Sequence, residues 1–257
     1  MSLPSILVTG GATRIGAAIV RGFSAAGWHT VIHYNSSGER ARALAATLPS
    51  AETVACDLAD GDAGEAMVEE LAERLGDWRC LVNSASIFEY DGVTRLAPAT
   101  NRSAMQINAT TPARMAQAYL RSARSASIRS VIQITDMKLA NPNPDFFSYT
   151  MSKHALGATI AMLAKHHASN PSVRVYGLAP GAILASHDQT EDETEVSHRL
   201  NLLGRKTGPD EIVEAARFMA GGALKSGSTL YIDSGQHLLD QDRDVIYLAR
   251  KGAEGDA

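Results

Sequence analysis

The fold of this chain is decided near its start by residues 6–16, which read Ile6-Leu7-Val8-Thr9-Gly10-Gly11-Ala12-Thr13-Arg14-Ile15-Gly16. The apolar run 6–8 is typical of a buried strand, and it leads into a glycine-rich turn and a helical pattern over about 15–26. Glycines between a strand and a helix let the backbone approach a pyrophosphate, whose charge the helix N-terminus favours. Since many loops need glycine for other reasons, this turn has to be interpreted with the rest of the chain.

Short apolar runs alternate with longer amphipathic stretches along the chain. The expected strands lie at 6–8, 30–32, 53–55, 80–82, 130–134, 173–176 and 229–232. The expected helices lie at about 15–26, 38–47, 61–75, 100–123, 148–168 and 209–220. This alternation predicts an α/β fold, a Rossmann-type doubly wound parallel sheet of seven strands, in a single domain over residues 1–257.

Two segments do not fit this alternation. Residues 182–200 are polar and rich in acids, and we expect a loop and short helix that form a substrate lid. Residues 238–257 follow the last expected strand without a clear partner element. We expect them to form a C-terminal tail that is able to pack on a neighbouring subunit.

Composition argues against several classes of function. Hydrophobic residues make up 45% of the 257 residues, enough for a sizeable core. The net charge is -4 and the basic residues are scattered, which argues against a nucleic-acid partner. No apolar run is long enough to cross a bilayer and no signal-peptide pattern is present, so we expect a cytoplasmic protein without a membrane partner. Cys56 and Cys80 adjoin apolar runs and are expected to be reduced, and the scattered histidines predict no metal site.

Tyr149 and Lys153 lie four residues apart in a helical stretch, so their side chains face the same way. A phenol is a poor acid at neutral pH because its unperturbed pKa is about 10. A nearby ammonium favours the phenolate, so we expect Lys153 to lower the pKa of Tyr149. Tyr149 is therefore a candidate for proton exchange with a substrate.

The glycine-rich turn and the Tyr149/Lys153 pair together resemble the short-chain dehydrogenase/reductase family, whose cofactor signature is Thr-Gly-x-x-x-Gly-x-Gly. The resemblance covers about residues 5–237, and Arg14 departs from it where the middle glycine usually stands. It implies that Asn108 is a structural or proton-relay residue and that Lys153 also holds the nicotinamide ribose. The cofactor-binding residues that it implies are Thr9, Gly10, Arg14, Ile15, Gly16, Asp57, Leu58, Asn83, Ser84, Ala85, Tyr149, Lys153, Pro180 and Gly181.

The end of the second expected strand indicates which nicotinamide cofactor is used. An acid there would bind the ribose hydroxyls of NAD and repel a 2′-phosphate. The sequence there is His33-Tyr34-Asn35-Ser36, and no acid occurs before Glu39. These four residues are candidate cofactor contacts, and they favour NADPH/NADP+ over NAD.

Asp136 stands thirteen residues before Tyr149, where most members of the family have a serine that binds a substrate carbonyl or alcohol. A carboxylate beside a ketone would repel the negative charge that develops on its oxygen. It suits a substrate that carries N–H groups and needs a proton. We therefore interpret Asp136, Tyr149, Lys153 and Asn108 as the catalytic residues.

Asp136 and Arg14 together resemble the pteridine reductases, a subgroup that includes the bacterial dihydromonapterin reductases. Ser86 and Phe88 match the serine and aromatic pair of that subgroup, which implies that a pterin stacks on Phe88. The resemblance implies that Arg14, Ser86, Phe88, Asp136 and Tyr149 bind the substrate. The implied reaction is NADPH-dependent hydride transfer to a C=N bond of a dihydropterin such as dihydromonapterin, dihydrobiopterin or dihydrofolate, in a protein that forms a homotetramer.

Two alternatives stay open at this point. The first is a short-chain NADP(H)-dependent oxidoreductase that acts on a carbonyl or alcohol of another small substrate. The second is a cofactor-binding scaffold without catalysis, although the presence of Tyr149, Lys153 and Asn108 argues against it.

Overall fold

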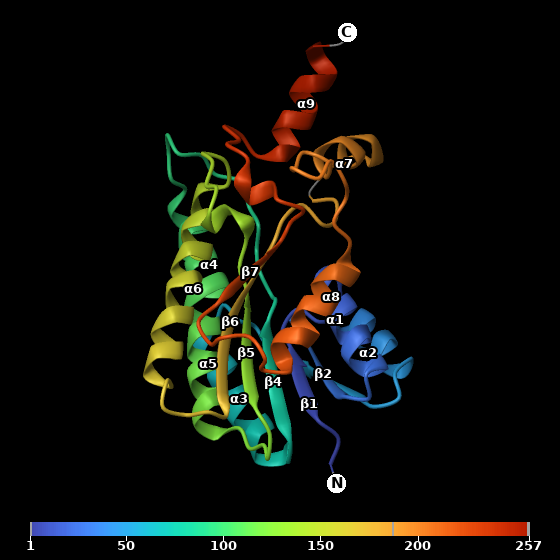
Figure 1. Cartoon of the computed structure of the whole chain (residues 1–257), viewed down its shortest axis with the longest axis vertical. Coiled ribbons are helices and arrows are strands. Elements are labelled where there is room, and N and C mark those ends of the chain that lie inside the picture. The colour runs from blue at the N-terminus through green and yellow to red at the C-terminus, as the bar shows by residue number, and fades with distance from the viewer. Residues whose placement is uncertain (1, 187, 256–257) are drawn as a thin grey trace.

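All seven expected strands are present in the computed structural model, and they form one parallel sheet. The structure describes residues 2–186 and 188–255, with side chains up to Arg250. The strands are β1 (Ser5–Val8), β2 (His29–Tyr34), β3 (Ala51–Ala55), β4 (Trp78–Asn83), β5 (Arg129–Ile134), β6 (Val173–Pro180) and β7 (Thr229–Ile232). Their order is β3-β2-β1-β4-β5-β6-β7, so the direction of winding reverses between β1 and β4 (Figure 1). The Rossmann-type doubly wound fold is confirmed.

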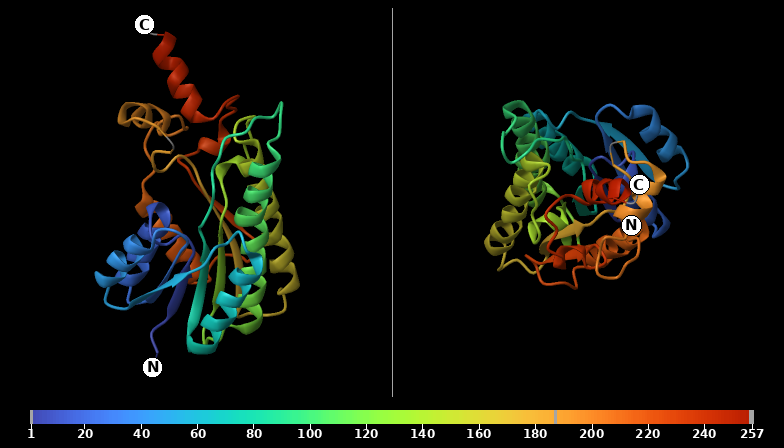
Figure 2. Two further views of the ribbon diagram at one scale, coloured as in Figure 1. Left: turned by 180° about the vertical axis from the view of Figure 1, so that it is seen from behind. Right: turned by 90° about the horizontal axis from the view of Figure 1, so that it is seen from above.

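Helices cover both faces of the sheet (Figures 1 and 2). One face packs against α1 (Arg14–Ala25), α2 (Gly38–Ala46) and α8 (Pro209–Ala220). The other packs against α3 (Gly61–Arg74), α5 (Thr111–Ser122) and α6 (Phe147–His166). The remaining elements are α4 (Pro98–Met105), η1 (Gln106–Thr110), η2 (Met137–Leu139), α7 (Glu191–Ser197), η3 (Gln236–Leu238) and α9 (Val245–Gly255).

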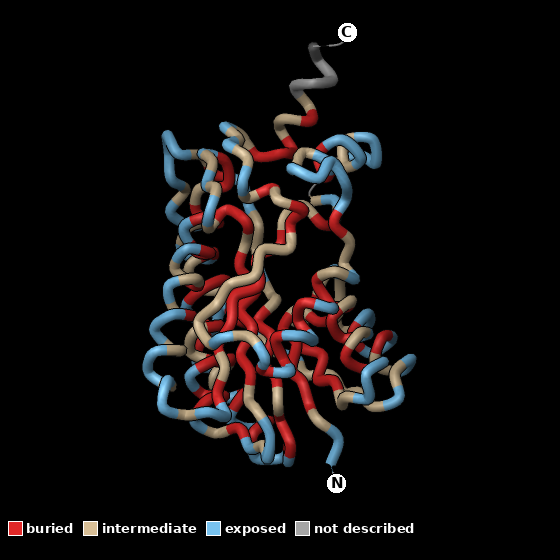
Figure 3. Tube along the Cα trace, viewed as in Figure 1, coloured by how far each residue is buried: buried red, intermediate tan, exposed pale blue. Residues whose placement is uncertain are grey.

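The apolar character of the strands follows from burial on both sides. In β1, Ile6 and Val8 enter one core while Leu7 enters the other, because successive side chains point to opposite faces. A parallel sheet covered by helices on both faces therefore needs continuous apolar strands. Figure 3 shows the result as buried strands within exposed outer turns.

The single helix expected at 100–123 is divided into three parts. Between α4 and α5 lies the π-helical segment η1, in which the amide of Thr111 donates to the carbonyl of Gln106. Pro112 has no amide hydrogen and its ring crowds the preceding turn, so an ordinary α-helical ladder cannot continue through this point. The wider turn places Asn108 inside the protein.

The C-terminal residues do not lack a partner element, in contrast to what the sequence indicated. They form α9, which lies beside α7 above the carboxyl ends of the strands (Figures 1 and 2). Arg250 of α9 pairs with Glu193 at 2.7 Å and with Asp188 at 2.8 Å. The expected lid and tail therefore contact each other within one chain. Residue 187 of the lid and residues 256–257 of the tail lie outside the described residues.

Within the part of the chain that the structure describes, no helix is both long and apolar enough to cross a membrane.

Candidate active site

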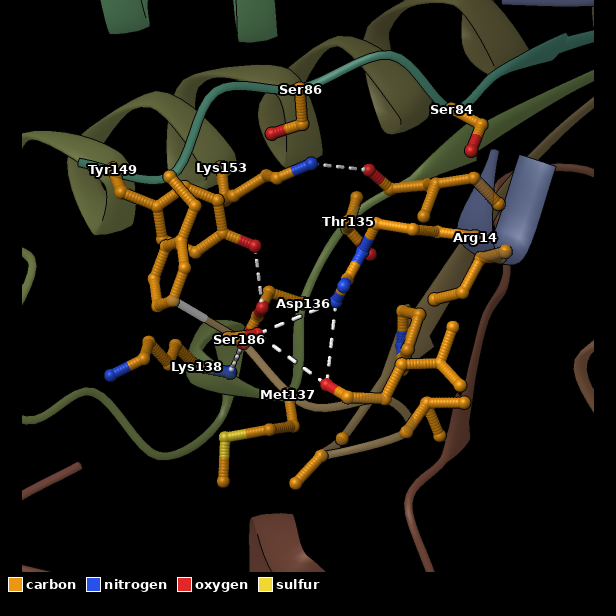
Figure 4. A pocket seen from close by; sticks show the side chains of 18 of the residues that line it. Arg14, Ser84, Ser86, Thr135, Asp136, Met137, Lys138, Tyr149, Lys153 and Ser186 are labelled. Atoms are coloured by element: carbon orange, nitrogen blue, oxygen red, sulfur yellow. Dashed lines mark hydrogen bonds between the residues drawn. The ribbon is translucent and has the colours of Figure 1, made fainter. Parts of the chain in front are cut away.

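A cavity of about 310 Å³ opens at the carboxyl ends of β1, β4, β5 and β6, next to the point where the winding reverses (Figure 4). Ligands of open α/β sheets bind at such a point. The predicted site residues that line it are Gly10, Arg14, Ile15, Gly16, Ser84, Ala85, Ser86, Phe88, Asp136, Tyr149, Lys153, Pro180 and Gly181. Those that do not line it are Thr9, His33, Tyr34, Asn35, Ser36, Asp57, Leu58, Asn83 and Asn108.

The glycine-rich turn forms one end of the cavity. Gly10 has a φ of +63°, and a Cβ on Gly16 would lie 2.3 Å from the carbonyl oxygen of Gly10, so neither position accepts a side chain easily. The hydroxyl of Thr9 accepts hydrogen bonds from the amides of Ser84 and Ala85 at 2.9 and 3.0 Å. These contacts hold the end of β4 against the turn and leave backbone at the start of α1 open to a ligand.

His33 supports this turn from behind. Its ring is buried, its Nδ1 accepts a hydrogen bond from the amide of Gly10 at 3.1 Å, and its Nε2 donates to the carbonyl of Cys56 at 3.0 Å. Burial lowers the pKa of His33 to about 4, so the ring is neutral at physiological pH. Because both ring nitrogens bond to the protein, His33 positions the turn, in contrast to the direct cofactor contact expected from the sequence.

The ends of β2 and β3 lie beside the turn. Asn35 and Ser36 are exposed, and the amide of Asn35 donates to the carboxylate of Asp57 at 3.3 Å. Leu58 is buried, and its carbonyl accepts a hydrogen bond from Thr111 at 2.8 Å. The segment after β2 therefore presents the amide of Asn35 and the hydroxyl of Ser36. The carboxylate that bonds to Asn35 comes from Asp57, in the segment after β3.

Asp136 and Tyr149 meet at the centre of the cavity. The hydroxyl of Tyr149 donates to Oδ2 of Asp136 at 2.6 Å, while Oδ1 accepts from the amide of Lys138 at 2.9 Å (Figure 4). Asp136 follows the end of β5 and Tyr149 lies in the first turn of α6. The thirteen-residue spacing therefore places the two functional groups in direct contact.

The pKa of Tyr149 is not lowered, which corrects the expectation from sequence. Burial and the hydrogen-bonded carboxyl of Asp136 raise its pKa well above the usual value of a phenol. Burial also raises the pKa of Asp136, against the opposing effects of Lys138 and of the bond from Tyr149. The hydroxyl of Tyr149 therefore keeps its proton at neutral pH, and the carboxyl of Asp136 holds a proton more readily than an exposed carboxyl does.

Lys153 lies one helical turn beyond Tyr149. Its ammonium donates to the carbonyl of Ile134 at 2.8 Å and lies 5.5 Å from the centre of the Tyr149 ring. Burial lowers the pKa of Lys153 to about 8, although Asp136 acts in the opposite direction. The side chain faces the cavity, as expected, but bonds to the end of β5 rather than to the phenol.

Asn108 connects the π-helical segment to two other elements. Its side chain accepts from the amide of Ile87 at 2.8 Å and donates to the carbonyl of Ile87 at 2.9 Å. It also donates to the hydroxyl of Ser152 at 3.0 Å. Asn108 thus fixes the segment after β4 against α6, which agrees with a structural role.

Arg14 connects the glycine-rich turn to the segment after β6. Its guanidinium donates to the carbonyl of Ala185 at 2.7 Å and to that of Leu184 at 3.3 Å. Figure 4 shows the guanidinium of Arg14 beside Ser186 of this segment. Its backbone has a φ of +52°, a left-handed conformation that favours glycine, and the signature has glycine at this position. The chain accepts this strain, of about 1–2 kcal/mol, at a residue whose side chain holds the start of the lid.

Phe88 forms an aromatic wall of the cavity. Its ring stacks on Phe146, with centroids 4.0 Å apart and planes at 26°, and its edge meets Tyr149 at 4.6 Å. The exposed hydroxyl of Ser86 lies nearby and lines the same cavity. A planar ligand can therefore lie between this wall and the glycine-rich end of the site.

The segments that follow β6 and β4 form another boundary of the cavity. Gly181 has no room for a side chain, because a Cβ would lie 2.5 Å from the side-chain oxygen of Gln236. Asn83 is buried and donates to Gln133 at 2.9 Å. Asn83 therefore joins β4 to β5 beneath the cavity and does not line it.

The sequence interpretation did not name the other residues that line the cavity, of which some flank predicted site residues and others come from distant parts of the chain. They are Thr13, Ile134, Thr135, Met137, Lys138, Asn143, Ala182, Ile183, Leu184, Ser186, Gln189, His198, Gln236, Asp244, Val245 and Ile246. A local signal was available for Thr13, which adjoins Arg14, and for the residues within two positions of Asp136, among them Lys138. No local pattern places residues 244–246 at a site built around the ends of β1 and β5. Among the described residues, no group of His, Cys, Asp and Glu is able to hold a metal ion.

A family model described as enoyl-(acyl carrier protein) reductase matches residues 10–237. The D-threitol dehydrogenase of Mycolicibacterium smegmatis is 30% identical over 89% of this chain and 91% of that protein. A dihydromonapterin reductase of Escherichia coli O6:H1 is 27% identical over 92% of this chain and 98% of that protein. The FolM alternative dihydrofolate reductase 1 of Brucella canis, solved in complex with NADP, is 32% identical with a TM-score of 0.85, over 94% of this chain and 96% of that one.

We expect the stability of the fold to depend on pH through His33. The unfolded chain takes up a proton near pH 6.5, while the folded chain does so only near pH 4. The contribution of the neutral His33 ring to the free energy of unfolding is therefore fully present above pH 6.5. It falls by up to about 3 kcal/mol as the pH decreases from 6.5 to 4. Urea denaturation of His33→Gln between pH 4 and 7 should show a flatter dependence than the unmodified protein. Replacing the exposed His166 with Gln should leave the slope in place, and an equally steep slope in His33→Gln would contradict the role assigned to His33.

The backbone strain at Arg14 predicts an inverted order of stability. Glycine in a helix usually lowers stability by about 1 kcal/mol relative to alanine. At Arg14 the positive φ should make Arg14→Gly more stable than Arg14→Ala by about 1 kcal/mol. Both variants should show faster amide hydrogen exchange in residues 183–186, since both lose the guanidinium contacts. The usual order, with Arg14→Ala the more stable, would show that the strain is absent.

Proposed function

Because this chain belongs to the short-chain dehydrogenase/reductase family, we propose that it is an NADPH-dependent reductase of a dihydropterin. Hydride transfer to a C=N bond of the substrate gives the tetrahydropterin. Dihydromonapterin, dihydrobiopterin and dihydrofolate are the candidate substrates. The observation that carries this proposal is the hydrogen bond between Tyr149 and Asp136, because the carboxyl replaces a hydroxyl at the reacting end of the cavity.

The residues present fit a nicotinamide dinucleotide. Gly10 and Gly16 leave backbone exposed at the start of α1, and the first turn of that helix has no acid to repel a phosphate. The end of β2 presents Asn35 and Ser36 in place of an acid, which suits the 2′-phosphate of NADPH. When bound, NADPH supplies the hydride, and the protein contributes position and protons.

Asp136 and Tyr149 favour reduction at a carbon–nitrogen bond. Hydride transfer to carbon leaves a nitrogen that needs a proton. The hydroxyl of Tyr149 keeps its proton at neutral pH because its pKa is raised, and burial also raises the pKa of its partner Asp136. An oxygen that gains negative charge would instead lie beside a carboxyl able to ionise. Asp136 also accepts hydrogen bonds, so it can orient the N–H groups of a heterocycle.

The shape of the site supports a flat substrate. Phe88 and Phe146 form a stacked aromatic wall, and the edge of the Phe88 ring contacts Tyr149. A bicyclic heterocycle placed against Phe88 would keep one edge within reach of Asp136 and Tyr149. The similarity to a dihydromonapterin reductase and to a FolM alternative dihydrofolate reductase agrees with this choice of substrate.

A carbonyl or alcohol oxidoreductase is the second candidate. It is favoured by the similarity to a D-threitol dehydrogenase, which has the higher identity of the two curated relatives described above. The carboxyl of Asp136 at the usual position of the serine hydroxyl argues against it. We also propose that the protein is cytoplasmic, as its composition indicates, and that it forms a homotetramer, the assembly that the family resemblance implies.

The substrate class can be tested by following NADPH oxidation with purified protein. We expect turnover of dihydromonapterin, dihydrobiopterin or dihydrofolate with a kcat/KM at least ~10-fold above that of a panel of ketones, sugars and quinones, a difference of about 1.4 kcal/mol in transition-state binding. Parallel assays with NADH should be slower. Good turnover of a carbonyl with no turnover of any pterin would favour the second candidate.

Replacing Asp136 should separate proton delivery from cofactor binding. Asp136→Asn keeps the size and a hydrogen-bond acceptor but cannot exchange a proton, so kcat for the pterin should fall about 100-fold. The Kd of NADPH should change by less than about twofold, because among the described residues the carboxyl accepts hydrogen bonds from Tyr149 and from the amide of Lys138, which leaves the glycine-rich turn untouched. Asp136→Ser, which restores the hydroxyl typical of the family, should shift the preference towards carbonyl substrates. An unchanged kcat in Asp136→Asn would remove Asp136 from the mechanism.

A further inference from the structure

Two segments about a hundred residues apart in sequence are joined at the floor of the cavity. We call residues 136–146 the Asp136 turn and residues 239–246 the C-terminal strap. The side chain of Asn141 donates to the carbonyl of Leu239. Asp145 accepts from the guanidinium of Arg243 at 2.8 and 2.9 Å and from the amide of Asp244 at 2.8 Å. The two segments therefore contact each other along most of their length.

The centre of this junction is a buried ion pair. The ammonium of Lys138 lies 2.8 Å from a carboxylate oxygen of Asp244, and the two residues are only 4% and 7% exposed. The ammonium also donates to the side-chain oxygen of Asn143 at 2.7 Å and lies 5.9 Å from the centre of the Phe146 ring. Charges this deeply buried are tolerated when they are paired and hydrogen-bonded, so each partner requires the other in place.

The same lysine contacts the reacting carboxyl through its backbone. The amide of Lys138 donates to Oδ1 of Asp136 at 2.9 Å, and this bond starts the short helix η2. The position of the Lys138 backbone thus orients the Asp136 carboxyl, and the position of its ammonium is set by Asp244. The Lys138–Asp244 ion pair and the bond from the Lys138 amide to Oδ1 therefore connect the C-terminal strap to the carboxyl whose other oxygen, Oδ2, accepts from Tyr149.

We propose that Lys138 and Asp244 are positioning residues for Asp136, and that the C-terminal strap is part of the apparatus that presents this carboxyl to the substrate. The role assigned to Asp136 in this inference rests on the proposed reductase function. Lys138 and Asp244 act through Asp136 and through the turn that carries it. The strap, which the sequence indicated as a tail, performs this task for its own chain.

The strap also forms a wall of the substrate cavity. Val245 and Ile246 line the cavity directly after Asp244. Ile246 is buried and packs with Phe146 and Tyr149, the rings that surround the reacting groups. Loss of the Lys138–Asp244 pair should therefore disturb the carboxyl and the adjoining wall together.

The charges around Asp136 determine how each substitution should act. Lys138 and Lys153 favour its ionised form, whereas burial opposes ionisation. The other titratable or charged groups at the site or in the junction are Arg14, Tyr149, His154, His198, Asp145, Arg243 and Asp244. Removing Lys138 should raise the pKa of Asp136, because a nearby positive charge is lost. Removing the charge of Asp244 should lower it, because the ammonium of Lys138 is then uncompensated.

The first experiment compares Lys138→Met with Asp244→Asn. The pKa of Asp136 is read from the ¹³C resonance of its carboxyl, assigned by its loss in Asp136→Asn. We expect the pKa of Asp136 to rise in Lys138→Met and to fall in Asp244→Asn. In the dihydropterin assay, the alkaline limb of the pH profile of kcat should likewise move in opposite directions in the two variants. A purely structural role predicts that both variants move the same way or not at all, and either result would overturn the proposal.

A double variant protects this test against unfolding. Replacing both partners of a buried ion pair with apolar residues can retain stability, whereas replacing one partner leaves an unpaired charge. Lys138→Met/Asp244→Leu should therefore have a melting temperature near that of the unmodified protein. Its kcat should be at least ~10-fold lower, and its Kd for NADPH should lie within about twofold of the unmodified value. Arg217→Met, which breaks an exposed pair on α8, serves as the control and should change none of these readouts.

The outcomes separate this inference from the proposed function. If the unmodified protein reduces no dihydropterin, the proposed function fails, while the Asp136 titration in the substrate-free protein still tests the positioning role. A double variant that is folded and has an unaltered Asp136 pKa and kcat would overturn the positioning role alone.

Discussion

Every strand of the sheet runs in the same direction, and the rest of the molecule depends on this constraint. Parallel strands need helical crossovers, the crossovers bury both faces of the sheet, and the strands are apolar as a result. Their carboxyl ends therefore meet at one edge, where Gly10, Ser84, Asp136 and Pro180 lie around a common cavity. Chemistry can be placed there because the polar residues follow the strands and do not interrupt them.

Burial determines the electrostatics of that edge. It raises the pKa values of Asp136 and Tyr149 and lowers the pKa of Lys153, because it disfavours the charged form of each group. The hydrogen bond from Tyr149 to Asp136 then joins two groups whose pKa values burial raises. Lys153 bonds to the backbone of Ile134, so its charge is directed to the end of β5. This arrangement agrees with the proposed role of Tyr149 and Asp136 in donating a proton to a substrate.

Residues that are unfavourable for their local structure or environment occur where the active site meets the segments that enclose it. Arg14 adopts a conformation suited to glycine, and in return its guanidinium contacts the loop after β6. Pro112 interrupts a helix, and the resulting π-helical turn directs Asn108 towards Ile87 and Ser152. Lys138 is buried and charged, and it is satisfied by the C-terminal strap. Each of these local costs coincides with a contact that shapes the cavity.

The sequence by itself determined the strands and most helices, because these depend on periodicity, which a linear pattern records directly. The resemblance to a family identified Asp136 and Tyr149 as catalytic residues, and the structure brought their side chains into contact. Tertiary structure decided the rest. His33 lies behind the glycine-rich turn, and its ring nitrogens bond to backbone groups of Gly10 and Cys56, which follow β1 and β3. The pKa of Tyr149 rises because burial and a carboxylate dominate over a lysine that bonds elsewhere. The C-terminal strap reaches the cavity through contacts with residues about a hundred positions earlier, and no local pattern specifies a contact at that distance.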